Sequence, residues 1–519
     1  MVLTMMLKRL LKYSFGAGAL GGSAYFLYKN EWEVSTLGAV RFGRAALTIA
    51  RVALDYKLSL QGQDSSTEEY KKIKSDVHLR SALRLRDMCC ANGGCFIKVG
   101  QHVGALDYLL PQEYVETMKV LHSKAPESDI QDLYKVIKED LGTDSSELFA
   151  SFDPHPLGAA SLAQVHKASL QDGTVVAVKV QHPKVKGHSY VDMKSMELLV
   201  HCIAWLFPEF KFLWLAEEMK KNLPKELDFL HEGHNCERMA RIFAKFKFLK
   251  VPKIYWDLSS ERVLTMEFCE GGQVDDKQYM TEHGISVNEV SRQLGELYSE
   301  MIFVQGYVHC DPHPGNVLVN QTEKGPQIVL LDHGLYTTLT DSFRLNYGHL
   351  WTSLLDADLE GMKHYADVMG CGDLYGLFAC VVTGRSWTAI SSGIKEVSYS
   401  TEEDNEIKNY AATYLTEIAA ILNRVPREML LILKTNDLLR GIEFSLKTHA
   451  KASSFITMSR CCVRAIAAQE LRECTSWWCR VRVTVHQHMS LLKIDLYEFY
   501  IWLRETFIIS TFLSVFWHR

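Results

Sequence analysis

Three short apolar runs, typical of β-strands, constrain most strongly what this chain can fold into. They span Thr174–Val180, Val263–Phe268 and Ile328–Leu331, and glycine, proline or aspartate stands at their ends. Between the second and third runs, apolar residues recur at helical spacing from Val287 to Ile302, which predicts one buried helix. Helical patterns dominate before residue 150 and after Thr340. We therefore predict an α+β chain with two lobes, flanked by helical extensions.

Composition narrows the functional class. The chain has 519 residues, of which 47% are hydrophobic and 23% charged, as expected of an ordered globular protein with one large bilobal domain or two to four units. A net charge of −5 argues against nucleic acid as a partner. Thirteen cysteines, an odd number that includes adjacent pairs, favour reduced thiols and an intracellular compartment.

The first thirty residues form a basic segment without Asp or Glu. Lys12 and Lys29 flank a weakly apolar, glycine-rich stretch from Tyr13 to Tyr28. Such a segment fits mitochondrial import with membrane anchoring, which we favour, with the inner membrane as the expected site. A secretory signal, a membrane span or a disordered basic terminus are the alternatives, although sixteen residues are short for a span.

The strand lysine is the first candidate site residue. In Val176-Ala177-Val178-Lys179, strand alternation places the valines on one face and Lys179 on the other, where its cationic group could meet phosphate oxygens. Taken alone the signal is weak, because most strand lysines lie at edges or in solvent.

A proline-rich loop from His309 to Asn316 carries the second candidate set. Asp311 and Asn316 lie five residues apart, and phosphoryl transfer needs a carboxylate beside the attacking hydroxyl and an amide oxygen on a metal. The alternatives are an Asx-rich turn or a transition-metal site of a hydrolase built from His309, Asp311 and His313.

The third strand ends in Asp332-His333-Gly334, and Asp332 could bind Mg²⁺ through oxygen. The ordered set is more specific than any member: Lys179, then Asp311 and Asn316, then Asp332, at intervals that fit the two lobes of a kinase. The metal-hydrolase hypothesis explains the middle element alone.

These residues resemble the UbiB or AarF-domain (ADCK) atypical kinases, and the resemblance runs from about Glu31 to Gln469. Lys98-Val99-Gly100-Gln101 looks like the family's KxGQ motif. Lys98 and Gln101 would share one helix face. In the family this helix folds over the active site, where a peptide substrate would otherwise lie. In isolation the motif would indicate a surface lysine and a helix-terminal glycine.

The segment from Pro156 to His166 resembles the alanine-rich loop that replaces the usual glycine-rich phosphate loop. The resemblance implies nucleotide-binding roles for these residues: Leu157, Gly158, Ala159, Ala160, Ser161 and Val165. Gly158 departs from the family, in which an alanine is common at this position. Because glycine lets the backbone approach phosphates more freely than alanine does, a nucleotide preference cannot be carried over.

Glu226-Leu227-Asp228 matches the family's ExD motif. The resemblance implies that Glu226 pairs with Lys179 or Lys98 near the nucleotide, whereas spacing alone would nominate Glu197. We favour Glu226. By the same resemblance, the segment from Glu267 to Cys269 is the hinge that contacts adenine.

The C-terminal region lacks an Ala-Pro-Glu motif after Asp332. It contains Met429–Asp437, which is similar to a C-terminal segment of the family and is expected to be a core helix. The run Thr506–Trp517 is too short to span a membrane. It could be a docking helix, an interfacial anchor or a segment packed against the domain.

The predicted organisation has five parts. Residues 1–30 target or anchor the chain, 31–150 form a helical extension with the KxGQ motif, 151–272 the N-lobe, 273–460 the C-lobe, and 461–519 a helical tail. The expected function is an atypical kinase or ATPase with ATP and Mg²⁺ as cofactors. A lipid or small-molecule acceptor at the mitochondrial membrane is expected by analogy. The alternative is a kinase-shaped scaffold that organises mitochondrial membranes through protein partners.

Overall fold

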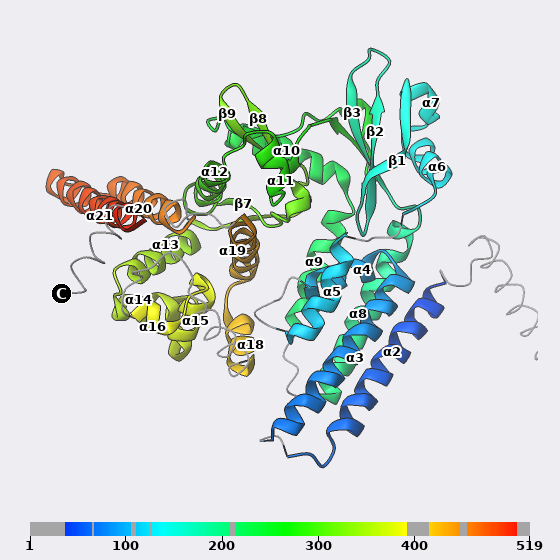
Figure 1. Ribbon diagram of the computed structural model, residues 1–519, viewed down its shortest axis with the longest axis horizontal. Coiled ribbons are helices and arrows are strands. Elements are labelled where there is room, and N and C mark those ends of the chain that lie inside the picture. Colours follow the sequence, from blue (N-terminus) through cyan, green and yellow to red (C-terminus); the bar gives the residue numbers. More distant parts are fainter. Residues whose placement is uncertain are drawn as a thin grey trace, which may run out of the picture.

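The computed structural model describes residues 37–64, 67–104, 110–123, 127–207, 213–391, 415–446 and 454–505. The predicted targeting segment and the apolar run Thr506–Trp517 lie outside these residues. The described chain is an α+β structure with two lobes, and helices precede and follow the strand-containing part, as predicted (Figure 1).

An N-terminal helical bundle precedes the first sheet. It contains α2 (Gly38–Leu60), α3 (Glu68–Asn92), α4 (Cys95–Gly104) and α5 (Gln112–Ser123), and α8 (Val185–Leu206) packs along α2 (Figure 1). The Arg41 Nε of α2 donates to Asp192 Oδ1 of α8 at 2.8 Å, and both side chains are buried. This ion pair joins the extension to the helix that follows β3 (Val175–Gln181).

The first sheet is antiparallel with the order β1-β2-β3-β5. Its strands are β1 (Ser151–Ala159), β2 (Ala163–Ser169), β3 (Val175–Gln181) and β5 (Val263–Glu267). Val176, Val178 and Val180 are fully buried against α6 (Ile130–Leu141), and α7 (Ser145–Leu148) follows that helix. Because side chains alternate across a strand, Lys179 faces the opposite side, as the sequence predicted.

Two helices follow α8, and the ExD motif lies where they meet. They are α9 (Leu213–Glu226) and α10 (Phe229–Ile242). Asp228 of the ExD motif caps α10, since its Oδ1 accepts hydrogen bonds from the backbone N–H groups of Leu230 and His231 at 3.1 and 3.3 Å. An aspartate at this position satisfies amide groups that the helix itself leaves unpaired.

The second lobe is built on a sheet of order β4-β9-β8-β6. Its strands are β4 (Leu249–Lys250), β6 (Gly272–Gln273), β8 (Val317–Thr322) and β9 (Gly325–Leu330), while β7 (Tyr307–His309) pairs with β10 (Tyr336–Thr338). Shorter helical segments are η2 (Trp256–Leu258), α11 (Lys277–Glu282) and η4 (Pro314–Asn316).

The predicted central helix of this lobe is α12 (Val287–Ser299), which continues as the π-helical η3 (Glu300–Gln305). The apolar stripe expected along it is confirmed. Val290, Leu294, Leu297, Met301 and Ile302 are all buried in the largest hydrophobic core. Because η3 leads directly into β7, burial of these residues also positions the strand from which the loop of residues 309–316 begins.

Helices complete the C-terminal part. They are α13 (Asp341–Leu355), α14 (Leu359–Val368), η5 (Gly372–Leu374), α15 (Tyr375–Thr383), α16 (Trp387–Ser391), α18 (Leu415–Arg424), α19 (Arg427–Leu446), α20 (Ser454–Glu473) and α21 (Trp477–Glu505). Helix α20 packs on α12 and α13. Helix α19, which contains the segment Met429–Asp437, lies centrally below β7 in Figure 1 and buries Leu430, Leu433 and Leu439.

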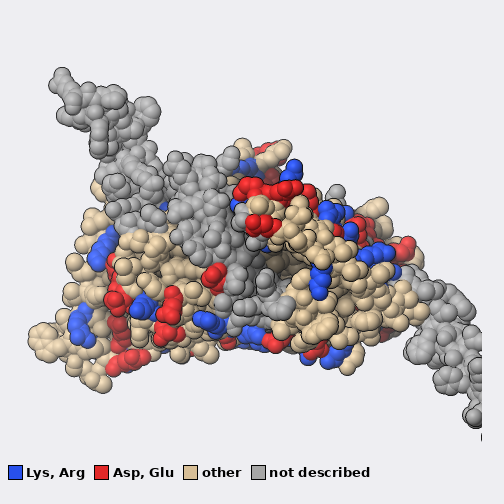
Figure 2. All heavy atoms as spheres, turned by 90° about the horizontal axis from the view of Figure 1, so that it is seen from below, with Lys and Arg blue, Asp and Glu red and all other residues tan. Residues whose placement is uncertain are grey.

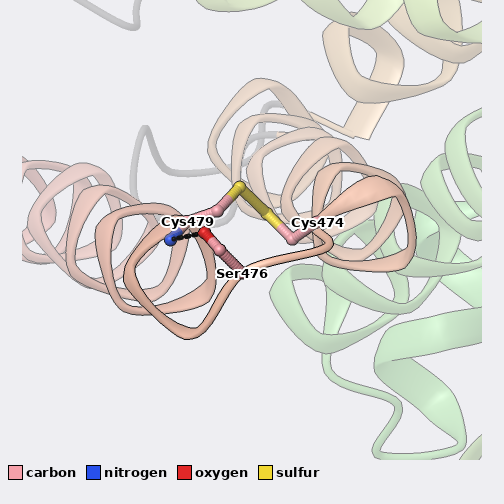
Figure 3. Close-up of a disulfide and its surroundings, with 3 residues drawn as sticks. All are labelled: Cys474, Ser476 and Cys479. Atoms are coloured by element: carbon pink, nitrogen blue, oxygen red, sulfur yellow. Dashed lines mark hydrogen bonds between the residues drawn. A yellow bond between two sulfur atoms is a disulfide. The ribbon is translucent and has the colours of Figure 1, made fainter.

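A disulfide joins Cys474 to Cys479 at the turn between α20 and α21 (Figure 3). The Cys479 N–H also donates to Ser476 Oγ at 3.1 Å. The expectation of reduced thiols throughout is therefore wrong at this pair. The turn between the helices brings the two Cα atoms to 5.6 Å, within the range that a disulfide requires.

The described surface has no strong charge asymmetry on the face drawn in Figure 2, where basic and acidic side chains are interspersed. Within the described ranges, no helix is both long and apolar enough to cross a bilayer.

Candidate functional site

Lys179 lies at the centre of the site. Its Nζ lies 2.7 and 2.8 Å from the two carboxylate oxygens of Glu232 and 3.0 Å from Asp332 Oδ2. It also lies 5.1 Å from the centre of the Phe229 ring. Burial favours the neutral amine, but the charges of Asp332 and Glu232 outweigh it and raise the pKa of Lys179 above its usual value. The lysine is therefore a fixed cation between the two lobes.

Glu232 of α10, which the sequence analysis did not identify, is the glutamate that pairs with Lys179. It is buried, and its Oε1 also accepts the N–H of His333 at 3.4 Å. Burial raises the pKa of Glu232 to about 7, against the opposing charge of Lys179. One signal could have found it: Glu232 lies four residues after Asp228, on a helix whose start the ExD motif defines.

The other two candidate glutamates lie elsewhere. Glu197 bonds Lys194 and Lys220 on the surface. Glu226 pairs with Lys98 of α4, whose Nζ lies 2.7 Å from Glu226 Oε2, and both side chains are largely buried, with exposed fractions of 17% and 7%. The structure therefore places Glu226 with the second of the two lysines that the family resemblance allowed.

The KxGQ motif packs α4 closely against α5. A Cβ at Gly100 would lie 2.3 Å from Leu121 Cδ1, and one at Gly104 would lie 3.0 Å from the backbone nitrogen of Lys119. Gln101 Nε2 donates to the Leu121 carbonyl at 3.0 Å, while Ser161 Oγ donates to Gln101 Oε1 at 3.2 Å. The motif thus joins α5, α4 and the loop after β1.

The alanine-rich loop is a tight turn between β1 and β2. The Ala160 N–H donates to the Ala163 carbonyl at 2.8 Å, and His182 Nε2 donates to the Ala160 carbonyl at 3.0 Å. Leu157 is exposed at 54%, and a Cβ at Gly158 would meet nothing within 4 Å. The loop is therefore held at Ala160 and Ser161, whereas Leu157, Gly158 and Ala159 belong to the exposed end of β1.

Val165 lines the space behind Lys179. It lies opposite Lys179 in the β2–β3 register and packs in a cluster with Ala177, Leu264 and Phe268. Apolar side chains from three neighbouring strand segments thus form one surface next to the cationic group.

The predicted hinge follows β5. Glu267 Oε1 lies 2.6 Å from Lys250 Nζ, and Glu267 Oε2 accepts the backbone N–H of Lys253 at 3.2 Å. Cys269 is partly buried, and burial raises the pKa of its thiol to about 11. The Glu267 carboxylate is held by these contacts, and its backbone N–H donates to the Lys253 carbonyl at 2.8 Å. The main chain that follows, at Phe268 and Cys269, is therefore the part of the predicted hinge to consider for ligand contact.

Asp311 and Asn316 share one loop. Asn316 Nδ2 donates to the Asp311 carbonyl at 3.2 Å, and η4 at Pro314 shapes the turn between them. Asp311 Oδ1 lies 2.9 Å from Lys434 Nζ of α19, a partner that the sequence gave no signal for. Burial alone would raise the pKa of Asp311, but Lys434 and Lys98 hold it well below its usual range. Asp311 is therefore a carboxylate.

Asp332 lies where β9 ends, with its side chain 36% exposed. Its Oδ1 accepts the Gly334 N–H at 2.9 Å, while Oδ2 contacts Lys179. Burial opposes ionisation, but Lys179 and the Gly334 N–H hold the pKa of Asp332 below its usual range. Carboxylate and amide oxygens are the ligand types that Mg²⁺ prefers, so Asp332 and Asn316 fit a magnesium ion chemically.

The two histidines of the loop have structural partners. His309 is fully buried; its Nε2 donates to the Asp332 carbonyl and its Nδ1 accepts from the Tyr298 hydroxyl, both at 2.8 Å. His313 Nδ1 accepts the Gly315 N–H at 3.1 Å. Both nitrogens of His309 are thus occupied. Among the described residues, no three His, Cys, Asp or Glu side chains are grouped to hold a metal ion, so the geometry does not support the metal-hydrolase hypothesis.

Comparison with known proteins identifies the family. Residues 120–366 match the ABC1 atypical kinase-like domain. The chain is 55% identical over 502 residues to AarF domain-containing protein kinase 1 of Gallus gallus, with 96% of each chain covered. It is 56% identical over 495 residues to the Mus musculus protein of the same name, covering 95% of this chain and 94% of that one. The chain belongs to the ABC1/AarF-domain atypical kinase family.

The predicted family and the kinase-like fold class are thereby confirmed. Among solved structures, the complex of Rv3197 with erythromycin from Mycobacterium tuberculosis is 20% identical, with a TM-score of 0.46, covering 75% of this chain and 97% of that chain. Within the present chain, the region that matches the ABC1 domain, residues 120–366, contains Lys179, Glu232, Asp311 and Asp332. Lys98 lies before it and Lys434 after it. Two of the three lysines of the site therefore come from outside the matched domain.

Proposed function

We propose that this protein is an atypical kinase or ATPase that binds Mg-ATP between its two lobes. Its membership of a kinase-like family supports nucleotide binding. The observation that carries the proposal is the ion pair between Lys179 of β3 and Asp332, which lie 153 residues apart in the chain and 3.0 Å apart in space. A cation for phosphates and a carboxylate for a metal ion are thus adjacent at the junction of the lobes.

The individual roles follow from the positions of the side chains. Lys179 holds phosphate oxygens, Asp332 and Asn316 hold Mg²⁺, and Asp311 positions the acceptor and takes its proton. The apolar surface at Val165 suits a flat base. Bound ATP supplies the phosphoryl group, so the protein itself has to bind ATP and orient it toward the acceptor.

For the acceptor we propose a lipid or another small molecule, with mitochondria as the site of action. The contact between Gln101 and Ser161 and the ion pair between Lys98 and Glu226 keep α4 beside the alanine-rich loop. A helix at this place competes with an extended peptide for the same space. The basic, acid-free residues 1–30 support mitochondrial import.

Thermal melting of the full-length protein tests the proposal. It is measured without ligand, with Mg²⁺ alone, with ATP and EDTA, with Mg-ATP and with Mg-ADP. At a hundred times its dissociation constant a ligand adds about 2.7 kcal/mol, which raises the melting temperature measurably. Asp332→Ala should lose the magnesium-dependent rise. Asp341→Ala is the matched control, since its side chain is 82% exposed and lies at the start of α13, and it should keep the rise.

The same variant separates the enzyme from the scaffold alternative. If Asp332→Ala folds, loses the nucleotide-dependent rise and still restores the phenotype of cells lacking the protein, then the scaffold interpretation replaces ours. No melting shift with any nucleotide in the wild type would contradict nucleotide binding itself.

A further inference from the structure

The acidic residues of the site are matched by lysines from three different parts of the chain. Lys179 of β3 pairs with Asp332, Lys98 of α4 with Glu226, and Lys434 of α19 with Asp311. The first pair belongs to the nucleotide site and the second to the KxGQ motif. The third pair has no role in the proposed function so far.

The contact between Lys434 and Asp311 is short and shielded. The Nζ and Oδ1 atoms lie 2.9 Å apart, and the side chains are 13% and 22% exposed. An ion pair in such surroundings is weakly screened by water and holds the carboxylate in one orientation. The exposed part of Asp311 remains available to an acceptor.

The other nearby cations are held in place by partners of their own. Lys98 contacts Glu226 at 2.7 Å. Lys179 contacts Glu232 and Asp332. Lys434 is thus the cation that the structure places on the carboxylate of Asp311.

Packing of α19 fixes the position of Lys434. Leu433 on one side of it is buried, and on the other side the Thr435 hydroxyl donates to the Leu431 carbonyl at 2.8 Å. One residue further, Asn436 Nδ2 donates to the Tyr347 hydroxyl of α13 at 3.1 Å. A functional side chain on a packed helix is held more firmly than one on a loop.

We propose that Lys434 is a positioning residue for phosphoryl transfer, which holds the Asp311 carboxylate toward the acceptor. This inference rests on the proposed function. In the transfer, the acceptor oxygen forms a bond to the γ-phosphorus of ATP, and the bond from that phosphorus to the bridging oxygen breaks. The bond's electron pair leaves with ADP, and the acceptor proton passes to the Asp311 carboxylate. Lys434 acts through Asp311 and contacts neither reactant.

The test compares Lys434→Met, Lys434→Arg and Arg427→Met in the full-length protein, with water as the acceptor. Arg427 is the matched control because it lies on the same helix in an exposed ion pair with Glu217. ATP hydrolysis is measured for kcat and KM, and melting for the Mg-ATP-dependent rise. We expect Lys434→Met to lower kcat about tenfold or more, with KM and the melting rise unchanged. Lys434→Arg should recover most of kcat, and Arg427→Met should match the wild type.

A double variant adds a second readout. If Lys434 acts through Asp311, then Lys434→Met should lower kcat no further once Asp311 is replaced by Asn. Wild-type kcat in Lys434→Met would overturn the inference. So would a lost Mg-ATP rise in that variant, because Lys434 would then belong to nucleotide binding or to the fold. Absence of turnover in the wild type would refute the proposed enzyme and the inference with it. Turnover in the wild type that Lys434→Met leaves unchanged would refute the inference alone.

Discussion

Helices α4 and α19 come from opposite ends of the chain and bring similar lysines to the same site. Lys98 of α4 lies 2.7 Å from Glu226, and Lys434 of α19 lies 2.9 Å from Asp311. The helices are supported differently. Helix α4 meets α5 at Gly100, where a Cβ would lie 2.3 Å from Leu121 Cδ1, whereas α19 is held by buried leucines along its length.

The two kinds of support predict where each helix is sensitive to substitution. A close contact that depends on a missing Cβ is sensitive to a single substitution, because the neighbouring side chain has to shift within a tightly packed interior. Apolar burial spread over many side chains loses only a part of its stabilisation at each position. We therefore expect single changes in α4 to affect the free energy of unfolding, whereas Lys434 in α19 affects mainly turnover.

The largest expected effect comes from the two glycines that distinguish the helices. Gly100→Leu should lower the free energy of unfolding by about 3 kcal/mol, since Leu121, Cys89 and Met118 surround the site of its Cβ. Gly441→Ala in α19 meets nothing within 4 Å and should raise it by about 1 kcal/mol, because alanine favours a helix. Denaturant unfolding of both variants measures the two changes in the free energy of unfolding. Equal changes would contradict the proposed difference between the two helices.

The two lysines provide the next comparison. Lys98→Met leaves Glu226 7% exposed without its cation and should cost about 2 kcal/mol of stability, whereas Lys434→Met should cost about 1 kcal/mol because Asp311 is 22% exposed. Denaturant unfolding compares them. Adding Glu226→Gln to Lys98→Met should restore part of the loss, and a further loss would contradict the assigned pair. Lys71→Met, in an exposed pair with Glu68, is the control and should change little.

A buried histidine in the helical bundle that supports α4 should make the stability of that bundle depend on pH. Burial lowers the pKa of His78 to about 4, and its Nδ1 interacts with the Tyr56 hydroxyl. Below its unfolded pKa of about 6.5 the unfolded state binds the proton and the folded state does not, so stability falls as the pH drops toward 4. The expected loss between pH 7 and pH 5 is about 2 kcal/mol. His78→Gln should remove that part of the pH dependence, and an unchanged pH profile would mean that His78 titrates normally.

The smallest expected effect on stability concerns the hydrogen bond between α4 and the alanine-rich loop. Ser161→Ala removes the hydrogen bond from Ser161 to Gln101 and should cost about 0.5 kcal/mol. Amide hydrogen exchange should rise locally in residues 158–163 and stay unchanged in α19. Thr352→Ala, which loses a comparable bond to the His349 carbonyl, is the control for a general loosening. A rise that is as large in α19 as in the loop would mean that the link is not local.

Periodicity was sufficient to predict the elements that frame the site. The run containing Lys179 became β3 with a shift of one residue, and the stripe from Val287 to Ile302 became α12 and η3. Alternation in a strand and 3.6-residue spacing in a helix are local properties, so a sequence reveals them directly. The loop around Asp311 was also predictable, because proline and Asx residues define it locally.

The pairing of charges was not predictable in the same way. Glu232 lies 53 residues from Lys179, and Lys434 lies 123 residues from Asp311, so packing of the helices decides each partner. Glu226 and Glu232 stand six residues apart and are chemically identical. Lys434 stands in a leucine-rich helix without any motif that points to catalysis. Only the fold distinguishes such residues from surface charges.

The ammonium group of Lys179 has a consequence for which ligands the site admits. Its three hydrogens face three carboxylate oxygens, two from Glu232 and one from Asp332. An incoming phosphate that takes one of these hydrogens leaves a carboxylate without its counterion. A ligand carrying its own divalent cation supplies a replacement at Asp332, whereas inorganic phosphate or metal-free ATP does not. If the site binds nucleotides as we propose, this arrangement of Lys179 favours nucleotides that arrive already complexed to a metal ion.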